Sequence, residues 1–147
     1  MVRPMGALYD WFIAADDSDA AEAISGVGNR PALEDIGIDP VVQGATLEEL
    51  LTGRSYDDIE EDPRCGHPVA IEPHGIPMVL TVTDGLIDAL AKATHGELET
   101  VAIPWAATEE FWGAVDPKLL AAHLKRLGFL ARTARERGWS MYCWVCT

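Results

Sequence analysis

The residues most suggestive of chemistry are two cysteines near the end of the chain, in the segment Cys143-Trp144-Val145-Cys146. Cysteines separated by two residues are typical of a redox pair, in which the start of a following helix lowers the pKa of the first thiol. Only Thr147 follows here, so we expect no such helix. In a strand, positions three apart point to opposite faces, which prevents easy disulfide closure. The sequence therefore predicts buried structural cysteines without redox activity.

A zinc site is the second chemistry to consider. Cys65 and His67, together with Cys143 and Cys146, would supply three thiolates and one imidazole, which is a ligand set that zinc accepts. Zinc knuckles take such ligands from tight turns, whereas this set would come from one loop and one strand. We predict no metal and no cofactor, and the sequence leaves open whether these four residues converge on a metal.

The best candidate for a binding site is the segment 104–112, which follows a predicted strand at residues 98–103 and contains two tryptophans and two adjacent carboxylates. Loops at such positions often carry function. The predicted binding residues are Trp105, Glu109 and Trp112, and no catalytic residue is predicted. A structural explanation is the alternative: Thr108 would cap a single helical turn, and the aromatic residues would fill the edge of the core.

Common catalytic motifs are missing from the sequence. It contains no G-x-S-x-G, no H-E-x-x-H and no glycine-rich phosphate loop, and its four histidines lie far apart. These absences weigh against common hydrolase, metalloprotease and nucleotide-binding classes. They do not exclude an enzyme whose groups meet only in the folded chain.

The charge is strongly negative and unevenly distributed. The net charge is −13; residues 1–115 carry 22 acidic and 5 basic residues, and residues 116–147 carry 2 acidic and 6 basic residues. Nucleic-acid binding depends on neutralising phosphates, so we expect no nucleic-acid partner. This charge favours a basic protein partner, or it is a solvated acidic surface that serves only solubility.

The expected environment is a reducing cytoplasm. Three cysteines are too few for a disulfide framework, and no apolar run is long enough to span a membrane. We therefore predict a cytoplasmic protein without membrane association, and the sequence leaves its oligomeric state open.

The clearest structural elements lie in the last third of the chain. Asp116 and Pro117 begin a helix with an apolar stripe that we assign to Leu119, Leu120, His123, Leu124, Leu127, Leu130, Ala131 and Ala134. Gly138 ends this helix. Residues 139–146 have hardly a polar side chain, which predicts a strand buried on both faces of a sheet.

The remaining elements are assigned from capping, turn and alternation patterns. We predict strands at residues 7–14, 33–38 and 98–103 and a hairpin at 69–71 and 78–83. Short helices are predicted after one of the competing caps Asp16, Asp17 and Ser18, after a capping box at Thr46 and Glu49, and after a cap at Thr83 or Asp84. The acidic run 57–62 is predicted to be an exposed loop or frayed turn. Together these elements predict one α+β domain over residues 1–147, with helices on a mixed or antiparallel sheet of about five strands.

The chain resembles the uncharacterised bacterial proteins of the YfbM-like class. The shared features are Met5-Gly6 before an aromatic strand, the segment Leu47-Glu48-Glu49-Leu50-Leu51-Thr52-Gly53, and a C-terminal helix that leads into an apolar last strand. The resemblance implies an α+β fold and no established activity, and it supplies no catalytic residues.

Two functions follow as expectations. The first is a non-enzymatic domain that binds another macromolecule, for example an immunity-type antagonist of a basic toxin or nuclease. The second is a small-molecule binder or enzyme with a pocket near Trp105, Glu109 and Trp112. The two differ in whether these side chains line a cleft.

Overall fold

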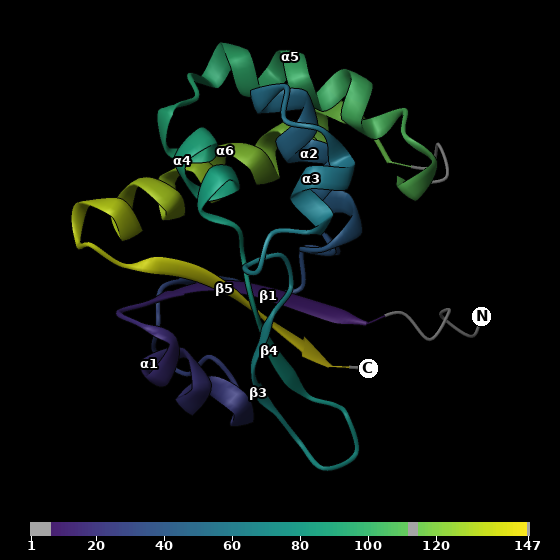
Figure 1. Cartoon of the computed structure of the whole chain (residues 1–147). Coiled ribbons are helices and arrows are strands. Elements are labelled where there is room, and N and C mark those ends of the chain that lie inside the picture. Colours follow the sequence, from purple (N-terminus) through teal and green to yellow (C-terminus); the bar gives the residue numbers. More distant parts are fainter. Residues whose placement is uncertain (1–6, 112–114, 147) are drawn as a thin grey trace.

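The chain folds into a twisted sheet covered by helices on both faces (Figure 1). The computed structural model describes residues 7–111 and 115–146. Among these residues the strands are β1 (Leu8–Ala14), β2 (Ala32–Leu33), β3 (Pro68–Ile71), β4 (Met78–Thr81) and β5 (Ser140–Cys146). They form one sheet in the order β2-β1-β5-β4-β3, and every neighbouring pair is antiparallel. The predicted α+β fold with a five-stranded sheet is confirmed.

The last strand of the chain lies at the centre of the sheet. β5 pairs with β1 from Ser140 to Cys146 on one side and with β4 on the other. Met141, Cys143 and Val145 point into the larger core beneath the helices, whereas Tyr142 belongs to a smaller core on the opposite face. The apolar character of this segment on both faces is therefore explained by burial on both sides, as the sequence predicted.

The longer helices lie above the sheet and a short N-terminal helix lies below it (Figure 1). The upper layer consists of α2 (Val42–Thr52), α4 (Asp84–Lys92), α5 (His95–Ala106) and α6 (Pro117–Glu136). On the other face lies α1 (Asp17–Ala21), which continues into the 3-10 turn η1 (Glu22–Ser25). α3 (Tyr56–Glu60) packs beside α2, and a second 3-10 turn, η2, spans Glu109–Phe111. No helix among the described residues is long and apolar enough to cross a membrane.

The C-terminal helix agrees closely with the sequence prediction. The carboxylate of Asp116 accepts a hydrogen bond from the amide of Lys118 at 2.9 Å, and Pro117 occupies the first turn. Six of the eight stripe residues are buried: Leu120, Leu124, Leu127, Leu130, Ala131 and Ala134. The assignment of Leu119 was wrong, because this side chain is 53% exposed on the outer face of the helix.

The prediction of a strand at residues 98–103 was wrong, because this segment lies inside α5. Thr94 and Glu97 form a capping box: Thr94 Oγ1 accepts from the Glu97 amide at 3.1 Å, and Glu97 Oε1 accepts from the Thr94 amide at 2.9 Å. Leu98, Val101 and Trp105 then recur at helical spacing and are buried. Pro104, which was expected to end the strand, lies within the helix.

Three other boundaries differ from the prediction. α2 begins at Val42, and Thr46 lies inside it, where its hydroxyl donates to the Val42 carbonyl at 3.0 Å. The strand predicted at residues 33–38 is reduced to the two residues of β2. The acidic run begins with a short helix, α3, because Ser55 caps it and Ile59 is buried beneath it. The predicted hairpin and the helix end at Gly53 are confirmed, and of the two predicted caps Thr83 and Asp84 the structure has Thr83.

Leu127 and Leu119 provide a matched test of α6 packing. We expect Leu127→Ala to lower the free energy of unfolding by about 2–5 kcal/mol, because a fully buried leucine leaves a cavity. Leu119→Ala makes the same chemical change at an exposed site and should alter the free energy of unfolding by no more than about 0.5 kcal/mol. Urea unfolding of both variants measures the difference. Equal losses would contradict this orientation of α6.

Candidate functional site

The predicted binding residues do not form a cleft with one another where the structure describes them. Trp105 is 0% exposed, packs edge-to-face against Phe111 and donates its indole N–H to the Gln43 carbonyl at 3.0 Å. Glu109 is exposed at the surface. Trp112 lies outside the described residues. Trp105 therefore serves as a core residue that joins α5 to α2, and ligand binding by these three residues stays a prediction.

The cysteines are placed as structural residues. Cys143 is buried in the centre of β5, and burial raises the pKa of its thiol well above the usual value. Burial, followed by the Glu48 carboxylate, also raises the pKa of Cys65. None of Cys65, Cys143 and Cys146 forms a disulfide. Within residues 7–111 and 115–146, no three His, Cys, Asp or Glu side chains are placed to hold a metal ion.

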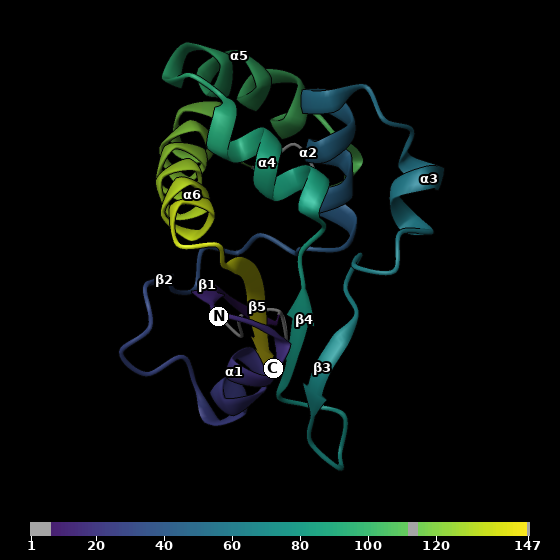
Figure 2. The same cartoon turned by 60° about the vertical axis from the view of Figure 1, so that its left-hand side comes forward.

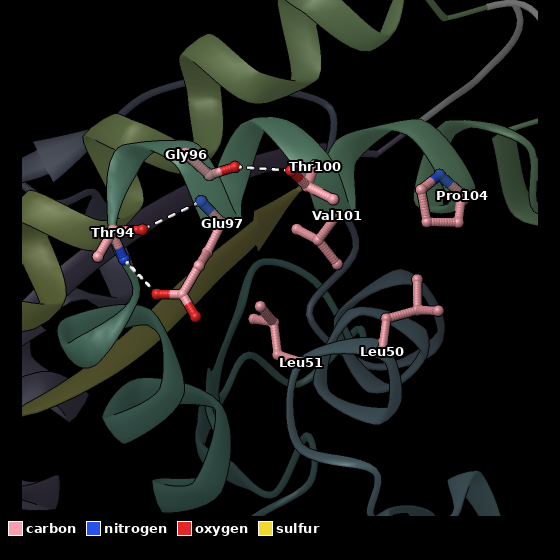
Figure 3. Close-up of a pocket in the computed structure, with 8 residues that line it drawn as sticks. All are labelled: Leu50, Leu51, Thr94, Gly96, Glu97, Thr100, Val101 and Pro104. Carbon is pink, nitrogen blue, oxygen red and sulfur yellow. Dashed lines mark hydrogen bonds between the residues drawn. The ribbon is translucent and has the colours of Figure 1, made fainter.

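The candidate functional site is an open groove between α2 and α5, which we call the α2–α5 groove (Figure 3). Leu50 and Leu51 extend from α2 toward Val101 and Pro104 of α5. Leu50 is 40% exposed, which is unusual for a leucine that faces another helix. The groove has a volume of about 660 Å³ and can receive apolar side chains.

The polar groups of the groove are already engaged within α5. The capping box occupies Thr94 and one carboxylate oxygen of Glu97, and the Thr100 hydroxyl donates to the Gly96 carbonyl at 2.9 Å. The hydrogen bond from the Thr94 amide holds the pKa of Glu97 below its usual value, so this exposed carboxylate is charged near neutral pH. Pro104 has no amide hydrogen and cannot donate to the Thr100 carbonyl, as a residue four positions on normally would. The groove thus presents a negative charge and polar acceptors beside an apolar floor.

A group of free carboxylates lies on α3 and the turn that follows it, and we call it the α3 acidic face. All four of its side chains are exposed, and none forms an ion pair with a described base. They are Asp57, Asp58, Glu60 and Glu61. Because α2 packs against both α3 and α5, the α3 acidic face and the α2–α5 groove lie on adjoining elements (Figure 2).

The helix between these two features is held in place by a buried carboxylate. Glu48 of α2 is only 1% exposed; its side chain accepts a hydrogen bond from the Thr83 hydroxyl and forms an ion pair of 3.3 Å with Arg54. The same guanidinium group reaches Asp62 at 3.0 Å. Gly85 leaves room for the Glu48 carboxylate, because a side chain there would collide with it. This network fixes α2 relative to α4 and to the chain that follows α3.

A second polar cluster lies below the sheet and ties the C-terminal strand to α1. Asp17 accepts from the Tyr142 hydroxyl at 2.7 Å and from Arg64 at 2.8 Å. Hydrogen bonds from Arg64, then from Tyr142, lower the pKa of Asp17. Burial, followed by the hydrogen bond to Asp17, raises the pKa of Tyr142 to about 12. Each polar group satisfies another, so the cluster is suited to holding the fold together.

No family model, curated protein or solved structure matches this chain. The resemblance to the YfbM-like class therefore stays a prediction, and the functional argument depends on the geometry alone.

Sequence reasoning missed the α2–α5 groove because residues 98–103 were assigned to a strand. The signal that could have found it is the sequence Thr94-His95-Gly96-Glu97, which has the spacing of a capping box and is followed by apolar residues at helical intervals. With α5 recognised, Leu50 and Pro104 could have been considered together as surface residues of two helices.

The polar cluster below the sheet predicts an alkaline loss of stability. The unfolded chain releases the Tyr142 proton near pH 10.0, whereas the folded chain retains it until about pH 12. The contribution of this group is therefore fully present below pH 10.0 and is lost between these two values. We expect the free energy of unfolding to fall less steeply over this range in Tyr142→Phe than in the wild type. The free energy of unfolding is measured by urea unfolding at several pH values. An identical decrease with pH in the two proteins would show that Tyr142 ionises at the same pH in the folded and unfolded chains.

Proposed function

We propose that this chain is a non-enzymatic, cytoplasmic binding protein whose partner is a basic protein. The observation that supports the proposal most is the combination of an open apolar groove with unpaired carboxylates on adjoining helices. Four carboxylates of the α3 acidic face lack an ion pair among the described residues, and Glu97 lies at the groove itself. The net charge of −13 adds a long-range attraction for a positively charged partner.

The proposed binding mode places an amphipathic segment of the partner across α2. Its apolar side chains enter the α2–α5 groove and cover Leu50, and its lysines or arginines face Glu97 and the α3 acidic face. Helix-in-groove recognition uses this arrangement of spaced apolar anchors and flanking charges. The apolar anchors would supply most of the affinity, and the charges would supply the orientation and the rate of association.

An immunity-type role is the concrete version of this proposal that we favour. A basic toxin or nuclease uses its positive surface to reach a negatively charged substrate, and an acidic antagonist would cover that surface. The polar side chains of the α2–α5 groove, Thr94, Glu97 and Thr100, form hydrogen bonds within α5. Because these side chains are engaged in holding the helix, the groove supports a binding role better than a catalytic one. The alternative pocket near Trp105 and Glu109 gains no support, because the Trp105 indole is fully buried.

The proposal is tested with a labelled amphipathic helical peptide in which lysines and leucines alternate at helical spacing. We expect fluorescence anisotropy to show saturable binding that weakens as salt is raised, because exposed charges are screened over about 10 Å at 0.1 M salt. A peptide with glutamate at every lysine position should not bind. Leu50→Lys places a positive charge at the groove and should weaken binding about tenfold or more, which corresponds to about 1.4 kcal/mol.

Two matched variants complete this test. Leu119→Lys makes the same change at an exposed leucine of α6, away from the groove, and should bind the peptide as the wild type does. Neutralising the α3 acidic face should slow association more than neutralising four exposed glutamates outside α3. Those four control residues are Glu22, Glu34, Glu72 and Glu136. Equal effects of both leucine variants, or equal binding of the acidic peptide, would overturn the proposal.

A further inference from the structure

A second groove, of opposite character, lies between α6 and β2. We propose that it is a binding site for a small organic carboxylate with an apolar body. The groove has a volume of about 620 Å³, which lies within the range of small-molecule sites, roughly 300–1,000 Å³. Its apolar wall is formed by Pro31, Ala32 and Leu33 of the β2 segment and by Leu130 and Phe129 of α6.

Phe129 is the exposed apolar surface of this groove. Phe129 is 67% exposed, the largest exposure among the large apolar residues that the structure describes as exposed. The neighbouring residues Gly128 and Leu130 are both buried, so Phe129 projects outward from a helix that is otherwise well packed. A flat or branched apolar group that covers Phe129 would remove this surface from water.

Two arginines lie on either side of Phe129 and have no carboxylate partner. Arg126 and Arg132, three residues before and after Phe129, both line the groove, and neither forms an ion pair with any described residue. The other described arginines all have a partner. Arg30, Arg54, Arg64 and Arg135 form ion pairs with carboxylates, and Arg137 stacks on the Trp139 ring at 4.9 Å.

These unpaired guanidinium groups stand out because acids are in large excess in this chain. Acidic residues number 24 against 11 basic ones, and four of the seven described arginines form an ion pair with a carboxylate. Lys125, also in the groove, contacts Glu99 at 3.4 Å, but both side chains remain partly exposed. The groove therefore concentrates positive charge on a molecule whose net charge is −13.

The ligand class follows from the geometry of the two side-chain types. A guanidinium group presents a fork of donors that matches the two oxygens of a carboxylate. Phe129 and the β2 segment accept an apolar body attached to that carboxylate. An inorganic anion would leave Phe129 exposed, and an apolar cation would be repelled by Arg126 and Arg132.

This inference is independent of the proposed function. The α2–α5 groove and the α3 acidic face share no residue with the α6–β2 groove. Failure of either proposal would leave the other standing, and the two are tested with ligands of opposite charge.

The test is an NMR titration of the full chain with phenylbutyrate. Phenylbutylamine serves as the cationic ligand with the same apolar body, and inorganic phosphate serves as the anion without one. We expect saturable shifts of the amide signals of residues 32–33 and 125–132 with phenylbutyrate alone. Arg126→Gln combined with Arg132→Gln should weaken binding about tenfold, as expected for the loss of charged hydrogen bonds. Phe129→Ala should also weaken it.

The matched control is Lys118→Gln combined with Lys92→Gln, which removes the same amount of positive charge from exposed positions outside the α6–β2 groove. This control should bind phenylbutyrate within about twofold of the wild type. If this control lost as much phenylbutyrate affinity as the double arginine variant, net charge alone would explain the effect, and the proposal would be overturned. Equal binding of phenylbutylamine or of phosphate would also overturn it, as would wild-type affinity in the double arginine variant. The single variant Arg126→Gln, at an exposed position, provides the same test should the double variant be poorly folded.

Discussion

The insertion of β5 between β1 and β4 is the interaction on which the rest of the structure depends. Without this strand, the sheet would be divided into two separate pairs, β2–β1 and β4–β3. The two faces of β5 belong to two different cores, so its burial joins the helical layer to the α1 side of the sheet. Hydrophobic burial on both faces makes an alternative register costly, because a slip by one residue would exchange the two sets of side chains.

The helical layer connects the buried strand β5 to the two grooves at the surface through helix–helix packing. α6 precedes β5 directly and packs against α4 and α5, and α2 in turn packs against α4 and α5. The buried carboxylate of Glu48 then fixes α2 by hydrogen bonding to Thr83 at the start of α4. The two grooves are therefore lined mostly by residues of helices and of β2, with Thr94 at the cap of α5 and Pro31 just before β2. Their opposite charges follow from the sequence, since 22 of the 24 acidic residues lie in the first 115 positions and five of the 11 basic residues lie on α6.

Sequence reasoning predicted the elements that are defined by local chemistry. The Asp116 cap, the stripe of α6, the hairpin and the two-sided apolar strand each have a short-range signal, and all four are present. The errors arose where two local signals compete. Val101 and Ile103 favour a strand, but the capping box at Thr94 and the packing of Trp105 against Phe111 favour the helix that forms. The grooves could not be predicted, because each is formed by segments that meet only through tertiary packing.

Native-state hydrogen exchange of β5 tests the central claim most directly. A strand paired on both sides and buried on both faces should exchange only through global unfolding, because no local opening exposes its amides. We therefore predict that the amides of residues 141–145 are among the slowest in the chain, with opening free energies equal to the global free energy of unfolding. Rapid exchange of these amides, with β1 still protected, would show that the C-terminal strand is only loosely attached and would contradict this account of the fold.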